Sequence, residues 1–156
     1  METMDSIETQ IAQNRFLAGL NPRFYHYFGE CATQQTAETD QEVFHEGNPA
    51  DRFYFIQSGK VALETFVPGL GRVTIESLGP GDALGWSWLF PPHQWHFTAS
   101  PIEPTELIAF DAASLRNRVE ENRDFGNQLL TRVSKMLLDR LLGTRTQLVD
   151  LYGMRP

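Results

Sequence analysis

The chain has 156 residues, a length that suggests one domain around a single hydrophobic core. Its composition, 41% hydrophobic and 21% charged, is that of a globular protein and excludes a largely disordered chain. The net charge of -7 argues against a surface that neutralises nucleic-acid phosphates, because such surfaces gather Lys and Arg.

Two short helical pieces are predicted within about residues 1–32. Apolar residues recur near helical spacing at Ile7, Ile11, Phe16 and Leu20, and Asn21-Pro22 ends this first piece. A second short piece carries the aromatic residues at positions 24, 25, 27 and 28. The polar stretch 33–40 is expected to be extended or looped.

From residue 42 the pattern changes to short apolar runs that are cut by glycine and proline. The runs cover 43–44, 53–56, 61–67, 72–78 and 107–110. Each break carries a residue that tolerates positive φ or cannot pair in a ladder. This punctuation is typical of a roll of antiparallel strands.

The last part of the chain is predicted to be helical. Asp111 is a good N-cap for a helix over 112–121 with Leu115 and Val119 facing inward, and Asp124 can cap a longer helix that follows. The apolar stripe along this longer helix is longer than packing against one roll requires. This predicts a homodimer in which two copies of the helix pair as a short coiled coil. The alternative is that the helix only lies along the roll. The residues expected to form the dimer helix are Leu130, Val133, Leu137, Leu141 and Leu148, and Leu151 continues the stripe.

Two stretches carry a family resemblance, VFHEGNPADRFYFIQSGKVAL at 43–63 and LGPGDALG at 78–85. They resemble the cyclic-nucleotide-binding domain of catabolite-activator-type regulators and of cyclic-nucleotide-dependent kinases. The resemblance implies a single domain, 1–156, with an α+β fold. Its centre is an antiparallel double-stranded β-helix, or β-roll, over about 33–110, flanked by N-terminal helices over about 1–32 and by C-terminal helices over about 111–152, the last of which is long. It does not by itself imply a cyclic-nucleotide ligand.

The resemblance also implies a phosphate-binding cassette after residue 78. In the family a short helix presents its amides to the cyclic phosphate, a Glu takes the ribose hydroxyl and an Arg pairs with the phosphate. Gly85 matches the cassette glycine, but Trp86 stands at the Glu position and His96 at the Arg position. Losing two charge-assisted hydrogen bonds of about 1.5–3 kcal/mol each predicts at most weak binding of cyclic nucleotides.

All three tryptophans of the chain lie between Trp86 and Trp95, and two interpretations of them stay open. In one, they fill the cassette pocket and leave a structural module for dimerisation or protein interaction. In the other, they line an altered pocket for a small anionic or aromatic ligand. That pocket would use Gly85, Trp86, Ser87, Trp88, His96, Phe97 and Thr98.

Other functions find little support in the sequence. The histidine spacings do not match a metal-binding barrel motif, and no serine or cysteine lies in a nucleophile motif, so no metal, cofactor or catalytic residue is expected. Only four residues follow Tyr152, too few for a helix-turn-helix, so we expect no direct DNA binding and regulation through an unidentified protein partner. The first ten residues show neither a basic start nor an apolar run, and no segment reaches the length of a membrane helix, so we expect a cytoplasmic protein without membrane contact.

Overall fold

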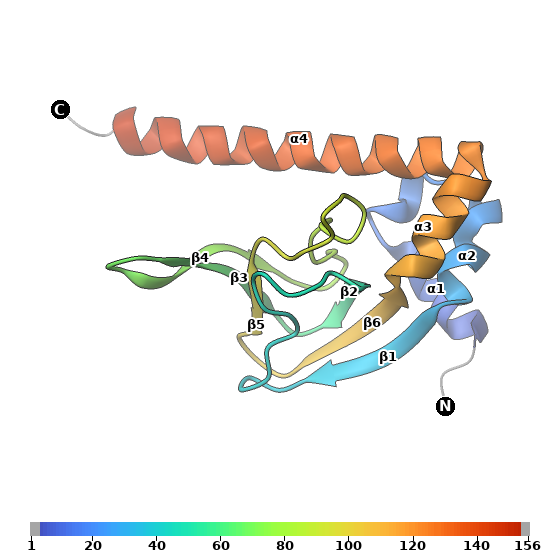
Figure 1. Ribbon diagram of the computed structural model, residues 1–156, viewed down its shortest axis with the longest axis horizontal. Coiled ribbons are helices and arrows are strands. Elements are labelled where there is room, and N and C mark those ends of the chain that lie inside the picture. The colour runs from blue at the N-terminus through green and yellow to red at the C-terminus, as the bar shows by residue number, and fades with distance from the viewer. Residues whose placement is uncertain (1–3, 154–156) are drawn as a thin grey trace.

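The computed structural model describes residues 4–153, with side chains from residue 9 onward except at position 18. The predicted helical piece at the N-terminus includes residues 1–3 and the side chain of Ile7, which lie outside this description. A roll of strands is flanked at one end by short helices, and one long helix runs over the roll and beyond it (Figure 1). In chain order the elements are α1 (Met4–Gln13), the short 3-10 helices η1 (Leu17–Gly19) and η2 (Pro22–Phe24), α2 (Tyr25–Gly29), β1 (Ala32–Ala37), β2 (Arg52–Ser58), β3 (Val61–Val67), β4 (Gly71–Leu78), β5 (Thr98–Pro101), β6 (Thr105–Asp111), α3 (Ala112–Glu121) and α4 (Arg123–Gly153).

The strands form two three-stranded sheets with the orders β1-β6-β2 and β4-β3-β5, and every neighbouring pair is antiparallel. The predicted β-roll between helices is therefore confirmed, and the polar stretch after residue 32 takes its extended alternative as β1. The apolar pair at 43–44 differs from expectation. It is no strand and contributes only a single bridge, from Phe44 to Ala99.

Strand β2 shows why the core is rich in aromatic residues. Its residues 53–56 are all buried, because alternate side chains enter the core on the two sides of the strand. The Phe53 ring lies 5.8 Å from that of Phe110, whereas Tyr54 turns toward Phe44 at 6.1 Å. One aromatic cluster thus meets the helical end of the molecule, and another fills the roll.

The start of each C-terminal helix depends on a capping side chain. Asp111 accepts a hydrogen bond from the Ser114 amide at 3.1 Å, so the predicted cap of α3 is confirmed. The prediction for α4 was wrong, because Asn122, not Asp124, precedes the first helical residue and accepts from the Phe125 amide at 3.2 Å. Asp124 lies inside the first turn and forms an ion pair with Arg23.

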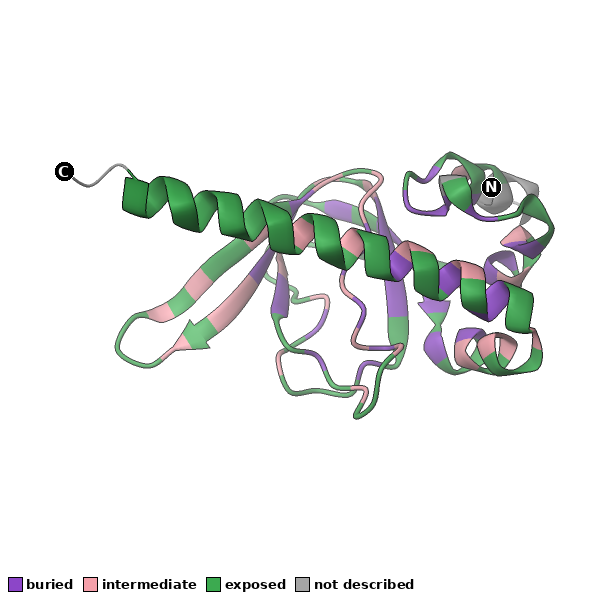
Figure 2. Ribbon diagram, turned by 90° about the horizontal axis from the view of Figure 1, so that it is seen from above, coloured by how far each residue is buried: buried purple, intermediate pink, exposed green. Residues whose placement is uncertain are grey.

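Burial along α4 changes sharply, as Figure 2 shows. Phe125, Leu129 and Val133 are buried against the domain, while the rest of the helix toward the C-terminus is largely exposed. Val133 was expected on the dimer face, but it lies one turn after Leu129 and on the same inward side. Leu130, Leu137, Leu141 and Leu148 are exposed, and their part in a dimer stays a prediction.

Within residues 4–153, no helix combines the length and the apolar character that crossing a bilayer requires.

Candidate functional site

The cassette segment, residues 81–98, carries the chain from β4 to β5. It begins beside β2, where the Gly81 amide donates to the Ile56 carbonyl and the Leu84 amide to that of Tyr54. Gly85 has a φ of 80°, a left-handed conformation that favours glycine. The Leu89 amide donates to the Trp86 carbonyl at 3.0 Å, which closes one turn. The short helix that the resemblance implies is thus reduced to this turn in residues 86–89.

Two of the indoles enter the aromatic cluster at the helical end. Trp86 is 5% exposed and Trp88 is 0% exposed. The Trp86 ring centre lies 4.4 Å from that of Phe16 and 4.9 Å from that of Phe53, and the Trp88 ring centre lies 4.8 Å from that of Phe53. At these separations the rings are in van der Waals contact and act as core side chains.

The third indole lies directly under the cassette glycine. Trp95 is 4% exposed and stacks on Phe44 with ring centres 3.7 Å apart and an interplanar angle of 8°. A Cβ atom placed on Gly85 would lie 3.3 Å from Cζ3 of Trp95. The indole therefore occupies the space next to the glycine where the resemblance places an anion.

The remaining predicted site residues do not converge on one point with the indoles. Nδ1 of His96 lies 2.9 Å from Oγ of Ser87 at the surface, and Phe97 is partly exposed. Thr98 is buried, and its Oγ1 accepts a hydrogen bond from the Glu46 amide at 3.0 Å. Of the two residues that the resemblance places at the family's charged positions, Trp86 lies in the core and His96 at the surface.

The indole N–H groups of Trp86 and Trp88 are buried, and no hydrogen-bond acceptor reaches them from the described residues. A buried donor without an acceptor costs about 1–3 kcal/mol. These are the two groups of the closed cassette that an incoming hydrogen-bond acceptor would stabilise.

Two side chains anchor the first half of the cassette segment. The Asn14 side-chain amide donates to the Gly81 carbonyl at 3.0 Å, and Nη1 of Arg116, on α3, donates to the Trp88 carbonyl at 2.7 Å. Sequence reasoning missed both residues. A polar side chain that bonds a loop carbonyl leaves no periodic signal of its own.

Arg140 connects the segment to α4. Its Nη2 donates to the Ala83 carbonyl at 3.4 Å, and its Nε lies 3.7 Å from Oε2 of Glu76 on β4. Arg140 follows the buried Val133 by two helical turns, so helical spacing alone could have placed it on the inward side. The hydrogen bond from Arg140 to Ala83 therefore joins the start of the cassette segment to the long helix.

A cleft of about 600 Å³ lies between β4 and α4 beside Arg140. Its walls include Leu78, Ala83 and Met136, together with the ion-paired Glu76. None of the predicted ligand residues lines this cleft. Space for a small molecule therefore exists near the cassette segment, but outside the tryptophan-lined pocket that we expected.

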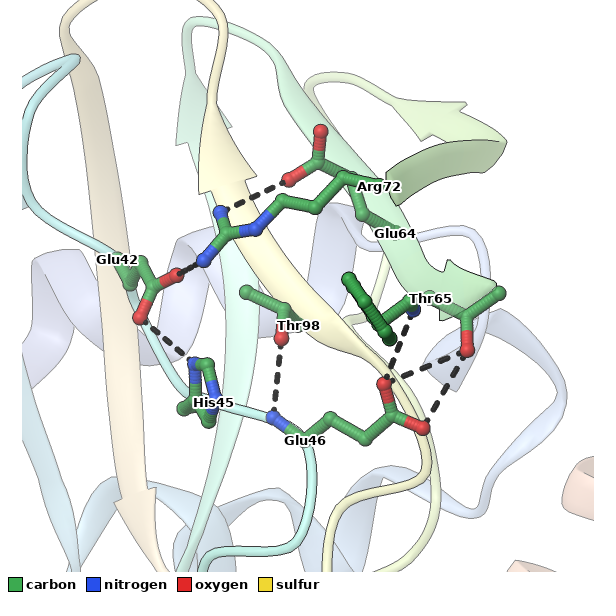
Figure 3. Close-up of polar contacts among 8 residues, drawn as sticks. Glu42, His45, Glu46, Glu64, Thr65, Arg72 and Thr98 are labelled. Atoms are coloured by element: carbon green, nitrogen blue, oxygen red, sulfur yellow. Dashed lines mark hydrogen bonds and ion pairs between the residues drawn. The ribbon is translucent and has the colours of Figure 1, made fainter. Parts of the chain in front are cut away.

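A polar cluster fixes the segment 42–46 to the sheet (Figure 3). Glu42 accepts from Nη2 of Arg72 at 2.6 Å and lies 3.0 Å from Nδ1 of His45, and Glu46 lies 3.3 Å from the Thr65 hydroxyl that donates to it. Burial raises the pKa of Glu42, but the hydrogen bonds from His45 and Arg72 outweigh it and hold that pKa below its usual value. The cluster encloses about 180 Å³ and is rich in carboxylates, which disfavours an anionic ligand there.

Metal and thiol chemistry were also sought in the part of the chain that the structure describes. There, no group of three His, Cys, Asp or Glu side chains is placed to hold a metal ion. Burial raises the pKa of Cys31 to about 11, so this thiol stays protonated at neutral pH and is a poor nucleophile.

Comparison with known proteins identifies the architecture. The family described as Cyclic nucleotide-binding domain matches residues 34–122, more than half of the chain. The chain belongs to the cyclic nucleotide-binding domain family. The match begins at the third residue of β1 and ends just after α3, so it includes the cassette segment and all of the roll except the first two residues of β1.

Relatives of this cyclic nucleotide-binding domain are regulators and sensors. A CRP-like cAMP-activated global transcriptional regulator of Mycobacterium tuberculosis is 32% identical over 109 residues, which cover 70% of this chain. The chain spans about half of that regulator's length, 47%.

Solved structures share the fold. The sensor domain of the transcriptional regulator DNR from Pseudomonas aeruginosa superposes with a TM-score of 0.74 at 19% identity, covering 90% of this chain and 95% of that one. The catabolite activator protein of Thermus thermophilus gives 0.70 at 22% identity, covering 88% of this chain and 62% of that one.

Proposed function

We propose that this chain is a regulatory module of the cyclic nucleotide-binding family whose cassette is closed by its own tryptophans. The observation that carries the proposal is the stacking of Trp95 on Phe44 directly beneath Gly85. In this state the family's phosphate position is occupied by an indole, so the module works through its surfaces rather than through a bound cyclic nucleotide.

The chemistry of the two exchanged positions supports the same conclusion. An indole at position 86 offers one N–H donor and no acceptor for a ribose hydroxyl. An imidazole at position 96 cannot pair with a phosphate in the bidentate manner of a guanidinium. Cyclic AMP is therefore bound weakly or not at all.

A second candidate function keeps a small-molecule ligand. The buried N–H groups of Trp86 and Trp88 without acceptors favour a flat or apolar ligand that carries a hydrogen-bond acceptor or a negative charge. Such a ligand would have to displace aromatic packing around Phe16 and Phe53, a cost that its own stacking on the indoles would offset.

The surfaces of the module are those of a homodimer. The exposed leucines of α4 present an apolar stripe that the roll leaves uncovered, and Arg140 links this helix to the cassette segment. In this proposal the output goes to a second copy and through it to a protein partner, without direct DNA or membrane binding and without catalysis. The cytoplasmic location stays a prediction.

The double change Trp86→Glu with His96→Arg tests the closed cassette, because it restores both of the family's polar groups. Trp86 is a core residue, so we expect the free energy of unfolding to fall by about 3–5 kcal/mol, with no binding of cyclic AMP. His96→Arg alone is the matched control and should change stability by less than about 0.5 kcal/mol, because His96 is exposed.

Binding of cyclic AMP to the same variants can be followed by tryptophan fluorescence during a titration. A folded double variant that binds cyclic AMP, with a change in indole emission, would contradict the closed cassette. A change in emission on adding an acceptor-bearing aromatic compound to the unmodified chain would favour the second candidate.

A further inference from the structure

A second cleft, which we call the amide cleft, lies between α1 and the β1-β6-β2 sheet. Its volume of about 730 Å³ exceeds that of the cleft beside Arg140. Strand residues alternate between the two faces of a sheet, so Ile108 in this cleft shares the face of Phe110, whose ring lies 5.6 Å from that of Phe28 on α2. The helices cover the Phe110 end of this face and leave the amide cleft at the other end.

Side-chain amides dominate the walls of the amide cleft. Among the described residues that line it, only Arg15 and Glu106 carry a charge, and Arg15 is paired with Asp82 at 2.6 Å. A solvated sheet face ordinarily carries charged residues, since these are the ones most often exposed. Here five of the nine glutamines of the chain gather instead, together with Asn14; the five are Gln10, Gln13, Gln34, Gln35 and Gln57.

The amides of the cleft retain hydrogen-bonding capacity for a ligand. Each amide offers two N–H donors and one carbonyl acceptor. Gln57 on β2 donates to Gln10 on α1 and so joins the two walls, whereas Gln13 and Gln34 are exposed and make no hydrogen bond to the described residues. Between the walls lie two buried apolar residues, Phe55 and Ile108, which are neighbours across β2 and β6. The cleft therefore combines many uncharged donors and acceptors with an apolar floor.

This combination fits an uncharged ligand that carries many hydroxyl groups. A charged ligand needs an opposite charge to offset its desolvation, and the guanidinium of Arg15 is already paired. A hydroxyl group both donates and accepts, so it can bond either end of an amide. A carbohydrate has such groups around its rim and apolar C–H faces that can rest on Phe55 and Ile108. The volume of the amide cleft also lies within the range of about 300–1,000 Å³ for small-molecule sites.

We propose that the amide cleft binds an uncharged carbohydrate through its side-chain amides. The site lies apart from the three tryptophans, so the proposal holds whether the cassette is closed or open. Asn14 connects the two regions, because its side chain lines the cleft and donates to the Gly81 carbonyl at 3.0 Å. A sugar bound in the cleft therefore lies beside one of the anchors of the cassette segment.

Nuclear magnetic resonance of the side-chain amides of a ¹⁵N-labelled chain tests the site. Gln13→Ala and Gln34→Ala each remove one amide signal and so assign the two residues. Glucose, galactose and maltose are then titrated separately into the unmodified chain. At least one of the three sugars is expected to shift both signals in a saturable way. The amide signals of Gln94 and Gln147, which are exposed outside the amide cleft, should stay unchanged.

The double variant Gln13→Ala with Gln34→Ala measures how much the amides contribute. Both side chains are exposed, so the variant folds, and the dissociation constant of the sugar, followed at the backbone amide of Gly81, should rise at least about tenfold. Gln94→Ala with Gln147→Ala is the matched control and should leave that constant unchanged.

Three results would overturn the proposal. The first is that none of the three sugars shifts the signals of Gln13 and Gln34. The second is a dissociation constant that the double alanine variant leaves unchanged. The third is that adenosine or an acetylated tetraglycine amide shifts the two signals while the sugars do not, because the amide cleft would then recognise a base or a peptide. None of these results bears on the closed cassette, which the titration with cyclic AMP tests separately.

Discussion

In the proposed closed cassette, the contact between Gly85 and Trp95 is central, and its contribution to stability can be measured by adding one carbon atom to Gly85. Gly85→Ala places a Cβ 3.3 Å from the indole and also forces alanine into a φ of 80°. Gly47→Ala is the matched control, since Gly47 has a φ of 91° with nothing within 4 Å of its Cβ position. Both should lose about 1 kcal/mol from the backbone.

We expect Gly85→Ala to lose more than Gly47→Ala in urea unfolding, because the indole is stacked on Phe44 and has little room to move. If both variants lost the same free energy of unfolding, Trp95 could move away from Gly85 at no cost, which would favour an open pocket.

The sequence located the cassette but could not predict how its side chains are used. The spacing from Gly85 to His96 follows from the resemblance alone, and it placed Trp86 and His96 at the family's charged positions. Whether an indole points into a pocket or into the core depends on Phe16, Phe44 and Phe53, which lie far away in the sequence. For that reason both interpretations of the tryptophans stayed open.

Among the elements, α4 begins at a cap that can be tested on its own. Asn122 accepts from the Phe125 amide and also donates from its side chain to the Tyr27 hydroxyl at 3.1 Å. Asn122→Ala should lower the free energy of unfolding by about 1–2 kcal/mol. Asp124→Asn removes only a surface ion pair with Arg23 and should cost less than about 0.5 kcal/mol. Thermal unfolding measures both losses. If Asp124→Asn lowered the stability more than Asn122→Ala, Asp124 would be the N-cap, as the sequence suggested.

Element boundaries were predicted well where a local signal marks them. Asp111 fixed the start of α3, and glycine turns separated β2, β3 and β4. The signals failed where distant residues decide the outcome. Phe44 lies in an apolar pair yet forms only one bridge, and Val133 belongs to the leucine stripe yet is buried by its own domain.

For the molecule as a whole, the exposed seam of α4, formed by Leu130, Leu137, Leu141 and Leu148, predicts a homodimer. Leu137→Glu with Leu141→Glu places two charges in the apolar seam and should convert dimers to monomers without unfolding the domain, because both side chains are exposed in the single chain. Sedimentation equilibrium measures this directly. Lys135→Glu is a suitable control, since Lys135 lies outside the seam and the change should leave the dimer intact.

The architecture also connects the cassette segment with the long helix α4. The cassette segment is held by Asn14, Arg116 and Arg140, which come from the N-terminal region, α3 and α4. In the dimer that we propose, a change in the cassette segment would therefore be transmitted through Arg140 to the face of α4 that binds the second copy. In our proposal, this connection allows a closed cassette to regulate without a cyclic nucleotide.

Calorimetric titration of the unmodified protein with cyclic AMP tests the central claim most directly. Two lost charge-assisted hydrogen bonds of about 1.5–3 kcal/mol each correspond to a loss of at least about a hundredfold in affinity. In the proposed closed state, a ligand would also have to displace the buried rings of Trp86 and Trp95. The account predicts no measurable heat of binding at micromolar cyclic AMP, and submicromolar binding would contradict it.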